Sequence, residues 1–106
     1  MQKQILKQVQ KMQQKMQMDL ANAQKELEEA TVEGVAGGGA IKAVVTGAQV
    51  LRSIKISKEV VDPQDVEMLE DLILVAINDG LEKSRQLSSN RMGKVAAGLN
   101  LPPGLF

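Results

Sequence analysis

The sequence predicts an α+β fold of order α-β-β-β-α, with a small antiparallel three-stranded sheet, two long helices and an intertwined homodimer. Two observations predict it. Apolar residues recur every three or four positions in two long segments, which is the period of a helix with one buried face. Between them lies a glycine-rich segment with β-branched runs, where consecutive glycines would each cost a helix roughly 1 kcal/mol relative to alanine. The first helix must therefore end before Gly34.

Residues 1–30 are expected to form the first helix. Its apolar stripe keeps near-heptad spacing, with one extra residue around Leu20. The stripe consists of Ile5, Val9, Met12, Met16, Leu20, Ala23, Leu27 and Ala30. A helix of this length is roughly 45 Å long, whereas a short strand spans only about 20 Å. The part of the stripe that the sheet cannot cover needs another partner, most simply the same helix of a second subunit, so we expect a homodimer.

Residues 31–56 are expected to form a β-meander with strands near 31–36, 40–46 and 49–56. Turns at Gly37–Gly39 and at Gly47 would connect them. The glycines also admit a phosphate-binding loop, but such a loop needs a helix N-terminus directly behind it. Here a β-prone run follows, and no Gly-Lys-Ser/Thr ending is present. The pattern therefore favours a turn.

Residues 63–97 are expected to form the second helix, with Asp62 as N-cap and Pro63 at the first helical position. Its segment 69–77 is apolar nearly all round, so we expect it on the sheet and at the dimer seam, with Leu74 and Ile77 in the core. The candidate interface residues are Leu69, Leu72, Ile73, Val75, Ala76 and Ile77. Gly80 is expected to be a weak point, where alanine would stabilise a helical backbone by roughly 0.5–1 kcal/mol.

Two further segments each admit two interpretations. Glu67, Glu70 and Asp71 could hold a metal ion or act in acid–base chemistry, but acids near a helix N-terminus are favoured by the helix dipole alone. We favour the dipole interpretation. Residues 98–106 form a Pro-Gly tail whose apolar side chains could dock on the body or fray from it.

Composition restricts the possible functions. A chain of 106 residues corresponds to a single domain. It has no His and no Cys, so the commonest general base and thiol chemistry are absent; we expect neither an enzyme nor a cofactor or metal site. With one Phe and no Trp or Tyr, stacking platforms for single strands are not expected. We predict neither a signal peptide nor a membrane span, and no small-molecule substrate.

Charge is distributed unevenly along the chain. The net charge is zero, but residues 1–18 carry four lysines and no acid, and residues 81–98 carry four basic residues and one acid. The middle, 19–80, has 5 basic and 12 acidic residues. The basic ends are the candidate DNA-binding residues: Lys3, Lys7, Lys11, Lys15, Lys83, Arg85, Arg91 and Lys94.

The order of motifs resembles the YbaB/EbfC family of bacterial nucleoid-associated proteins over nearly the whole chain. The resemblance rests on Val-Glu-Gly-x-Ala-Gly-Gly-Gly from Val32, Met-Leu-Glu-Asp-Leu-Ile from Met68, Asn78-Asp79, Met92-x-Lys94-Val95 and Gly98-Leu99-x-Leu101-Pro102-Pro103-Gly104. It implies an α-β-β-β-α homodimer with protruding helices that binds DNA in the bacterial cytoplasm, on the nucleoid. Two positions depart from the family pattern. Gly80 replaces a helix former, and Thr46-Gly47 replaces Asn-Gly.

The sequence is compatible with two functions. The first is a nucleoid-associated homodimer that binds duplex DNA with low sequence specificity and organises the chromosome or modulates gene expression. Lysines without neighbouring acids are free to neutralise phosphates, while glutamine side chains can add contacts that position without specifying sequence. The alternative is a helical dimeric scaffold or adaptor that binds another protein, with a methionine-rich stripe suited to adaptable packing.

Overall fold

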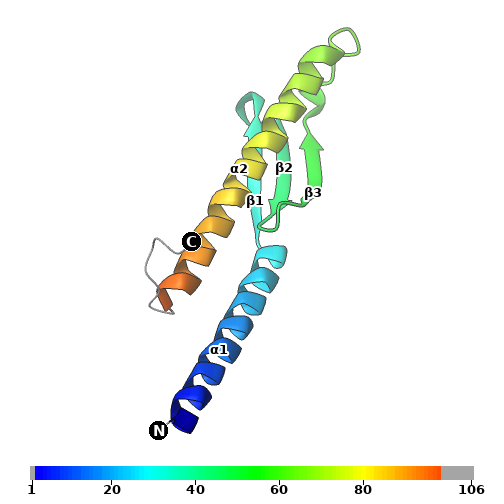
Figure 1. The fold of residues 1–106 in the computed structure, drawn as a ribbon. Coiled ribbons are helices and arrows are strands. Elements are labelled where there is room, and N and C mark those ends of the chain that lie inside the picture. Colours follow the sequence, from blue (N-terminus) through cyan, green and yellow to red (C-terminus); the bar gives the residue numbers. More distant parts are fainter. Residues whose placement is uncertain (1, 99–106) are drawn as a thin grey trace.

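The structure, a computed structural model of one chain, describes residues 2–98 and confirms the predicted α-β-β-β-α order with its three-stranded antiparallel sheet. Helix α1 spans Gln2–Glu29 and helix α2 spans Val66–Gly98. Between them lie strands β1 (Thr31–Ala36), β2 (Ile41–Thr46) and β3 (Leu51–Ile56), in one antiparallel sheet of order β1-β2-β3. Helix α2 crosses one face of the sheet, and α1 runs away from it (Figure 1). The chain is therefore elongated, with extents of 77 × 24 × 16 Å. Of the tail expected at 98–106, Gly98 is the last residue of α2, and residues 99–106 lie outside the described part of the chain.

Glycine forms the first turn of the meander, as predicted. Gly37, Gly38 and Gly39 all have positive φ, at 62°, 68° and 94°, a region open to glycine but costly for residues with a Cβ. They form a short 3-10 turn between β1 and β2. No helix follows them, so the geometry of a phosphate-binding loop does not arise.

In the second turn, between β2 and β3, the glycine is needed for close packing and not for a positive φ. The positive φ of 64° falls on Gln49, not on Gly47. A Cβ at Gly47 would lie 2.8 Å from both the carbonyl oxygen and Cδ2 of Leu27, so only glycine lets the turn approach the end of α1. The Gly47 N–H donates to the Ala30 carbonyl at 3.0 Å, which joins this turn to the segment after α1.

Helix α2 begins three residues later than expected, at Val66. The Asp62 carboxylate accepts the Gln64 N–H at 2.9 Å, which makes a local turn over Pro63. Asp65 is the residue that caps the helix, because its carboxylate accepts the Met68 N–H at 3.3 Å. Both aspartates have side chains that can cap a helix. The helix begins directly after Asp65 and not after Asp62.

Small residues allow α2 to cross the sheet closely. A Cβ at Gly34 of β1 would lie 2.1 Å from the Ala76 carbonyl oxygen and 2.3 Å from the Gly80 nitrogen. Ala76, Gly80 and Ser84, spaced by four residues, are all buried along this contact. The Ser84 hydroxyl donates to the Thr46 carbonyl at 2.6 Å. The helix is continuous through Gly80, as preferred from the sequence, and the missing side chain of Gly80 permits its close packing against Val45 and Gly34.

The core is aliphatic and lies between α2 and the sheet. Ile41, Ala43 and Ala76 have no exposed surface, and Ala36 is 7% exposed. Leu69, Leu72, Ile73 and Ile77 of α2 pack against this cluster together with Ile54 and Val60. Ile77 thus belongs to the core, as expected. Leu74 does not, because it is 62% exposed in the chain.

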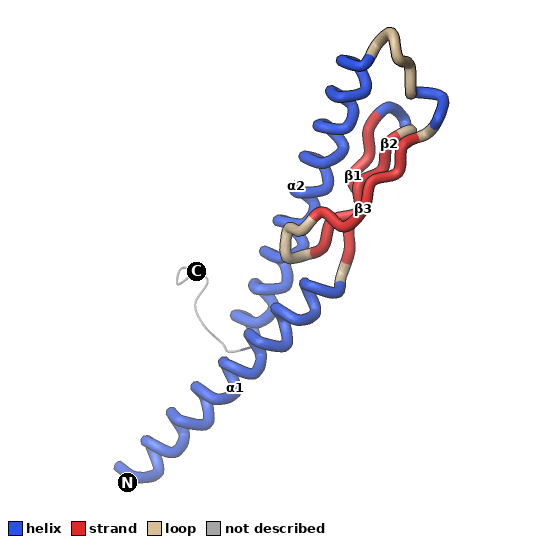
Figure 2. The backbone as a smooth tube through the Cα atoms, turned by 90° about the vertical axis from the view of Figure 1, so that its right-hand side faces the viewer, coloured by secondary structure: helices blue, strands red, loops and turns tan. Residues whose placement is uncertain are grey.

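The apolar stripe of α1 is covered only at its C-terminal end. Ala23 and Leu27 are 0% and 6% exposed, where α1 lies beside the C-terminal half of α2 (Figure 2). Every side chain from residue 3 to residue 18 is exposed. The sheet therefore leaves most of the stripe uncovered, as its length predicted. In the described part of the chain, no helix is apolar over a long enough stretch to cross a bilayer.

Candidate nucleic-acid interface

The first half of α1 presents a line of four lysines to solvent. Successive residues in a helix are about 100° apart, so residues spaced by four stay near one face. Lys3, Lys7, Lys11 and Lys15 keep this spacing; the first three lie nearly opposite the apolar stripe, and Lys15 lies nearer to its flank. All four are exposed, and among residues 2–98 no acidic side chain comes within ion-pair distance of them. The positive charge of this face is therefore available to an external anion.

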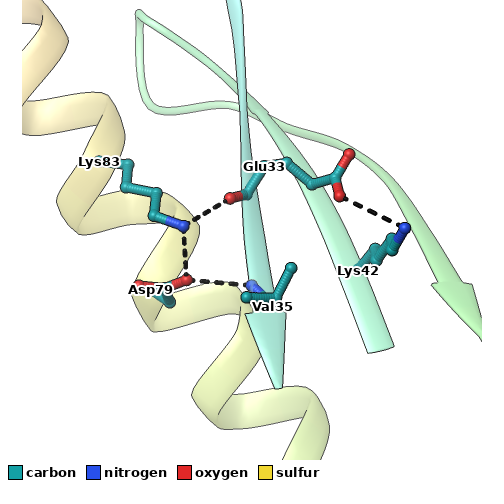
Figure 3. Close-up of polar contacts among 5 residues, drawn as sticks. All are labelled: Glu33, Val35, Lys42, Asp79 and Lys83. Carbon is teal, nitrogen blue, oxygen red and sulfur yellow. Dashed lines mark hydrogen bonds and ion pairs between the residues drawn. The ribbon is translucent and has the colours of Figure 1, made fainter. Parts of the chain in front are cut away.

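Lys83 of α2 is instead used within the fold. Its ammonium group lies 3.0 Å from the Asp79 carboxylate and donates to the Glu33 carbonyl at 2.9 Å (Figure 3). Asp79 also accepts the Val35 N–H at 3.0 Å. Glu33 and Val35 offer these backbone groups at the edge of β1 that β2 leaves free. Asp79 and Lys83 thus cap a strand edge that would otherwise be open to another strand.

The pKa of Asp79 is lowered from its ordinary value by this arrangement. The largest cause is the hydrogen bond from the Val35 N–H, followed by the hydrogen bond from Lys83. Both contacts favour the charged carboxylate. Asp79 therefore stays ionised at neutral pH, and it holds Lys83 against the sheet instead of leaving it free.

Two more basic side chains of α2 have acidic partners. Arg85 pairs with Glu82 at 2.7 Å, one turn away on the same helix. Arg91 pairs with Glu26 of α1 at 2.8 Å, which ties the two helices together beside a groove of about 250 Å³ that also involves Asp19, Asn22 and Lys94. Lys94 is exposed at the rim of this mixed-charge groove. The α2 candidates therefore offer an anion much less free charge than the lysines of α1.

The predicted interface residues of α2 mostly face the chain's own sheet. Ala76 is fully buried there, and Leu69, Leu72, Ile73 and Ile77 pack against the same core. Of the six, Val75 is the one with a largely exposed side chain, at 56%. Leu74, which was expected inside, is its exposed neighbour.

The acidic residues at the start of α2 do not form a metal site. No group of three His, Cys, Asp or Glu side chains between residues 2 and 98 is arranged to hold an ion. Glu67, Glu70 and Asp71 lie exposed in the first turns, where the helix dipole favours negative charge.

The sequence pattern missed the acidic partners of the α2 cations. Asp79 with Lys83 and Glu82 with Arg85 have the i,i+4 and i,i+3 spacings of helical ion pairs, so a search for these spacings would have found both. The pairing of Glu26 with Arg91 crosses between two helices, and no local spacing signals it.

Comparison with known sequences gives a consistent result. A sequence model described as the YbaB/EbfC DNA-binding family matches residues 1–99. A nucleoid-associated protein of Bacillus cereus strain B4264 is 54% identical over 88 residues, which cover 83% of this chain and 81% of the relative. A nucleoid-associated protein of Bacillus thuringiensis strain Al Hakam is 52% identical over the same shares.

The fold is also found among solved structures. The crystal structure of an uncharacterized protein from Helicobacter pylori is similar with a TM-score of 0.72, over 83% of this chain and 92% of that one. Its sequence identity is 17%, so this likeness supports the fold alone.

Proposed function

Since this chain belongs to the YbaB/EbfC DNA-binding family, we propose that it acts as a homodimer that binds duplex DNA with low sequence specificity on the bacterial nucleoid. There it helps to organise the chromosome or modulate gene expression. Relatives that are about half identical to it are named nucleoid-associated proteins. The part of the proposal that concerns the DNA-contacting residues is supported by this chain's own charges.

The line of unpaired lysines on α1 is the observation that carries the proposal. Duplex DNA releases counterions when cations neutralise its phosphates, which favours binding without reading sequence. Lys3, Lys7, Lys11 and Lys15 offer that charge without intramolecular competition, whereas Lys83, Arg85 and Arg91 are already paired. We therefore assign the main phosphate contacts to α1 and a lesser contribution to Lys94.

The homodimer is supported by the apolar surface of α2. A helix that is apolar on all sides is stable when other elements cover it. The sheet covers only one side of residues 69–77, and Leu74 and Val75 remain 62% and 56% exposed. A second copy that packs on this surface would remove both side chains from water.

A salt titration of duplex binding tests the proposal. If about 4–6 phosphates are neutralised per dimer, the logarithm of the binding constant should fall with the logarithm of salt concentration with a slope of about −4 to −5. Replacing Lys3, Lys7, Lys11 and Lys15 by Gln keeps helix propensity and should weaken binding to all duplexes alike while flattening the slope.

A matched control separates position from net charge. Replacing Lys42, Arg52, Lys55 and Lys58 by Gln removes the same charge from residues outside α1, and it should change the slope much less. If both variants behave alike, the α1 lysines have no special role. If the unaltered protein binds no duplex even at low salt, the scaffold or adaptor function takes the place of DNA binding.

A further inference from the structure

We propose that the exposed stripe of α1 is a second self-association surface, which pairs with the α1 of another copy and joins two dimers into a tetramer. The inference rests on the proposed homodimer through α2 and adds to it a separate contact. Its surface consists of Ile5, Val9, Met12 and Met16, with Leu6 beside them.

The stripe is one continuous surface that the chain's own fold covers in part. Ala23 and Leu27 are buried where α1 lies beside α2 and the Gly47 turn. Ile5 and Met12 of the same stripe are 60% and 61% exposed. The two views of the backbone show this half of α1 extending away from the sheet (Figures 1 and 2). The uncovered residues therefore form an apolar surface of the same kind as the covered ones.

The spacing of the uncovered part identifies a helix as its partner. From Ile5 to Met16 the steps are 4, 3 and 4 residues, which is the a/d pattern of a left-handed coiled coil. The extra residue near Leu20 ends this register where the chain's own core begins. A change of period thus coincides with the change from exposed to buried. The residues with coiled-coil spacing, Ile5 to Met16, are therefore the ones that remain exposed and can pack against another molecule.

The flanks of the stripe suit a second α1 in particular. Positions beside an a/d seam face each other across the pair, where like charges would repel. Here they are Leu6, Gln8 and Gln13, with Lys15 as the one charged residue among them. Lys3, Lys7 and Lys11 point away from the seam. Two α1 helices can therefore pair without opposing their charges, and the lysine face remains free for DNA.

The two apolar surfaces lie apart, which favours two separate contacts. Leu74 and Val75 are in the α2 segment that covers the sheet, while Ile5–Met16 lies toward the far end of a molecule 77 Å long (Figure 1). A symmetric dimer contact centred on Leu74 and Val75 leaves the exposed stripe of α1 available for a second contact. A seam of about two heptads is short, so the pairing should be weak in dilute solution and stronger where DNA holds several dimers together.

Sedimentation equilibrium with two matched variants tests the proposal. Met12 lies in the seam and Met18 lies on the lysine side of α1, and the two are similarly exposed, at 61% and 64%. From about 10 µM to about 1 mM, the unaltered protein and Met18→Gln should pass from dimer to tetramer. Met12→Gln should raise the dimer–tetramer dissociation constant by about tenfold, because it removes a buried apolar side chain from each arm. Equal behaviour of the two variants would overturn the proposal.

A Leu74→Asp background separates this contact from the proposed dimer. If both surfaces act as described, Leu74→Asp should still form dimers through its arms at high concentration, and adding Met12→Gln should leave monomers. A Leu74→Asp protein that stays monomeric throughout would overturn arm pairing while supporting the α2 dimer. If Met12→Gln alone gives monomers at low concentration, α1 carries the primary dimer contact, and the tetramer is overturned.

Cross-linking gives a second readout. The chain has no cysteine, so one introduced cysteine reports only its own surroundings. Under mild oxidation Met12→Cys should form a disulfide between chains much faster than Met18→Cys, because the bond needs Cβ atoms about 4 Å apart. Equal rates would contradict the seam. Binding to anionic phosphatidylglycerol vesicles that Met12→Gln abolishes, without a change in stoichiometry, would assign the stripe to a lipid surface and overturn the proposal.

Discussion

Gly34 and Gly80 are the residues that set the distance between α2 and the sheet. An added Cβ at Gly80 would come within 2.7 Å of Cγ2 of Val45, a buried β-branched side chain with little freedom to move. Gly80→Ala should therefore destabilise the fold by about 1–3 kcal/mol, contrary to the stabilisation that helix propensity alone predicts. Gly34→Ala should cost more, because its Cβ would meet backbone atoms.

Gly93 provides the control for this experiment. It lies in the same helix, and a Cβ there would meet no atom within 4 Å. Gly93→Ala should stabilise by roughly 0.5–1 kcal/mol through helix propensity. Denaturant unfolding of the three variants measures the differences. Stabilisation by Gly80→Ala would show that α2 does not approach β1 this closely.

Asp79 gives a prediction about pH. Its pKa is lower in the folded state, because the Val35 N–H and then Lys83 stabilise the carboxylate. A lowered folded pKa adds stability that is present above the unfolded pKa and is lost as pH falls through the folded value. Asp79→Asn should therefore destabilise at pH 7, and the difference from the unaltered protein should shrink in acid below about pH 4. A difference that is constant between the two pH values would contradict this account.

At the scale of elements, the exposed and buried residues of α2 should respond differently to charge. Ile77 packs against the core, so Ile77→Asp should cost several kcal/mol and unfold the chain. Leu74 is largely exposed, so Leu74→Asp should preserve the helical content and weaken the proposed dimer. Circular dichroism and sedimentation at micromolar concentration separate the two outcomes. Loss of folding by both variants would mean that the folded chain requires its partner.

The elements differ in how far local sequence determines them. The α1 helix was predictable from the spacing of its apolar stripe. The turn at 37–39 was predictable because glycine adopts the backbone conformations that a tight turn requires. The start of α2 was misplaced because Asp62 and Asp65 have the same capping chemistry, and only the path of the chain selects Asp65.

Residues that meet through the fold were harder to predict. The role of Gly80 depends on its approach to Gly34, and Arg91 is neutralised by a residue of another helix. The unpaired lysines of α1 were predictable as a set because residues 1–18 contain no acid. The sequence did not show which basic residues of α2 remain unpaired and available to an anion, because that depends on contacts across the fold.

For the whole molecule, local stability should vary along the long axis. The side chains of residues 3–18 are all exposed, and a helix without tertiary contacts opens at little cost. Amide hydrogens there should exchange rapidly in dilute protein, while those of β2 and of α2 near Gly80 should approach the global unfolding free energy, about 5–15 kcal/mol. Exchange measured by mass spectrometry tests this gradient, and uniform protection along the chain would contradict it.

The acids at the start of α2 and the lysines of α1 lie toward opposite ends of the chain (Figure 1). Such a separation gives each chain a large permanent electric dipole moment along its length. In a homodimer the components along the two-fold axis add, whereas those across it cancel. Near a polyanion this moment exerts a torque that turns the lysine-bearing end foremost before contact. In dilute salt the protein should therefore orient in an applied electric field, and transient birefringence would detect that orientation.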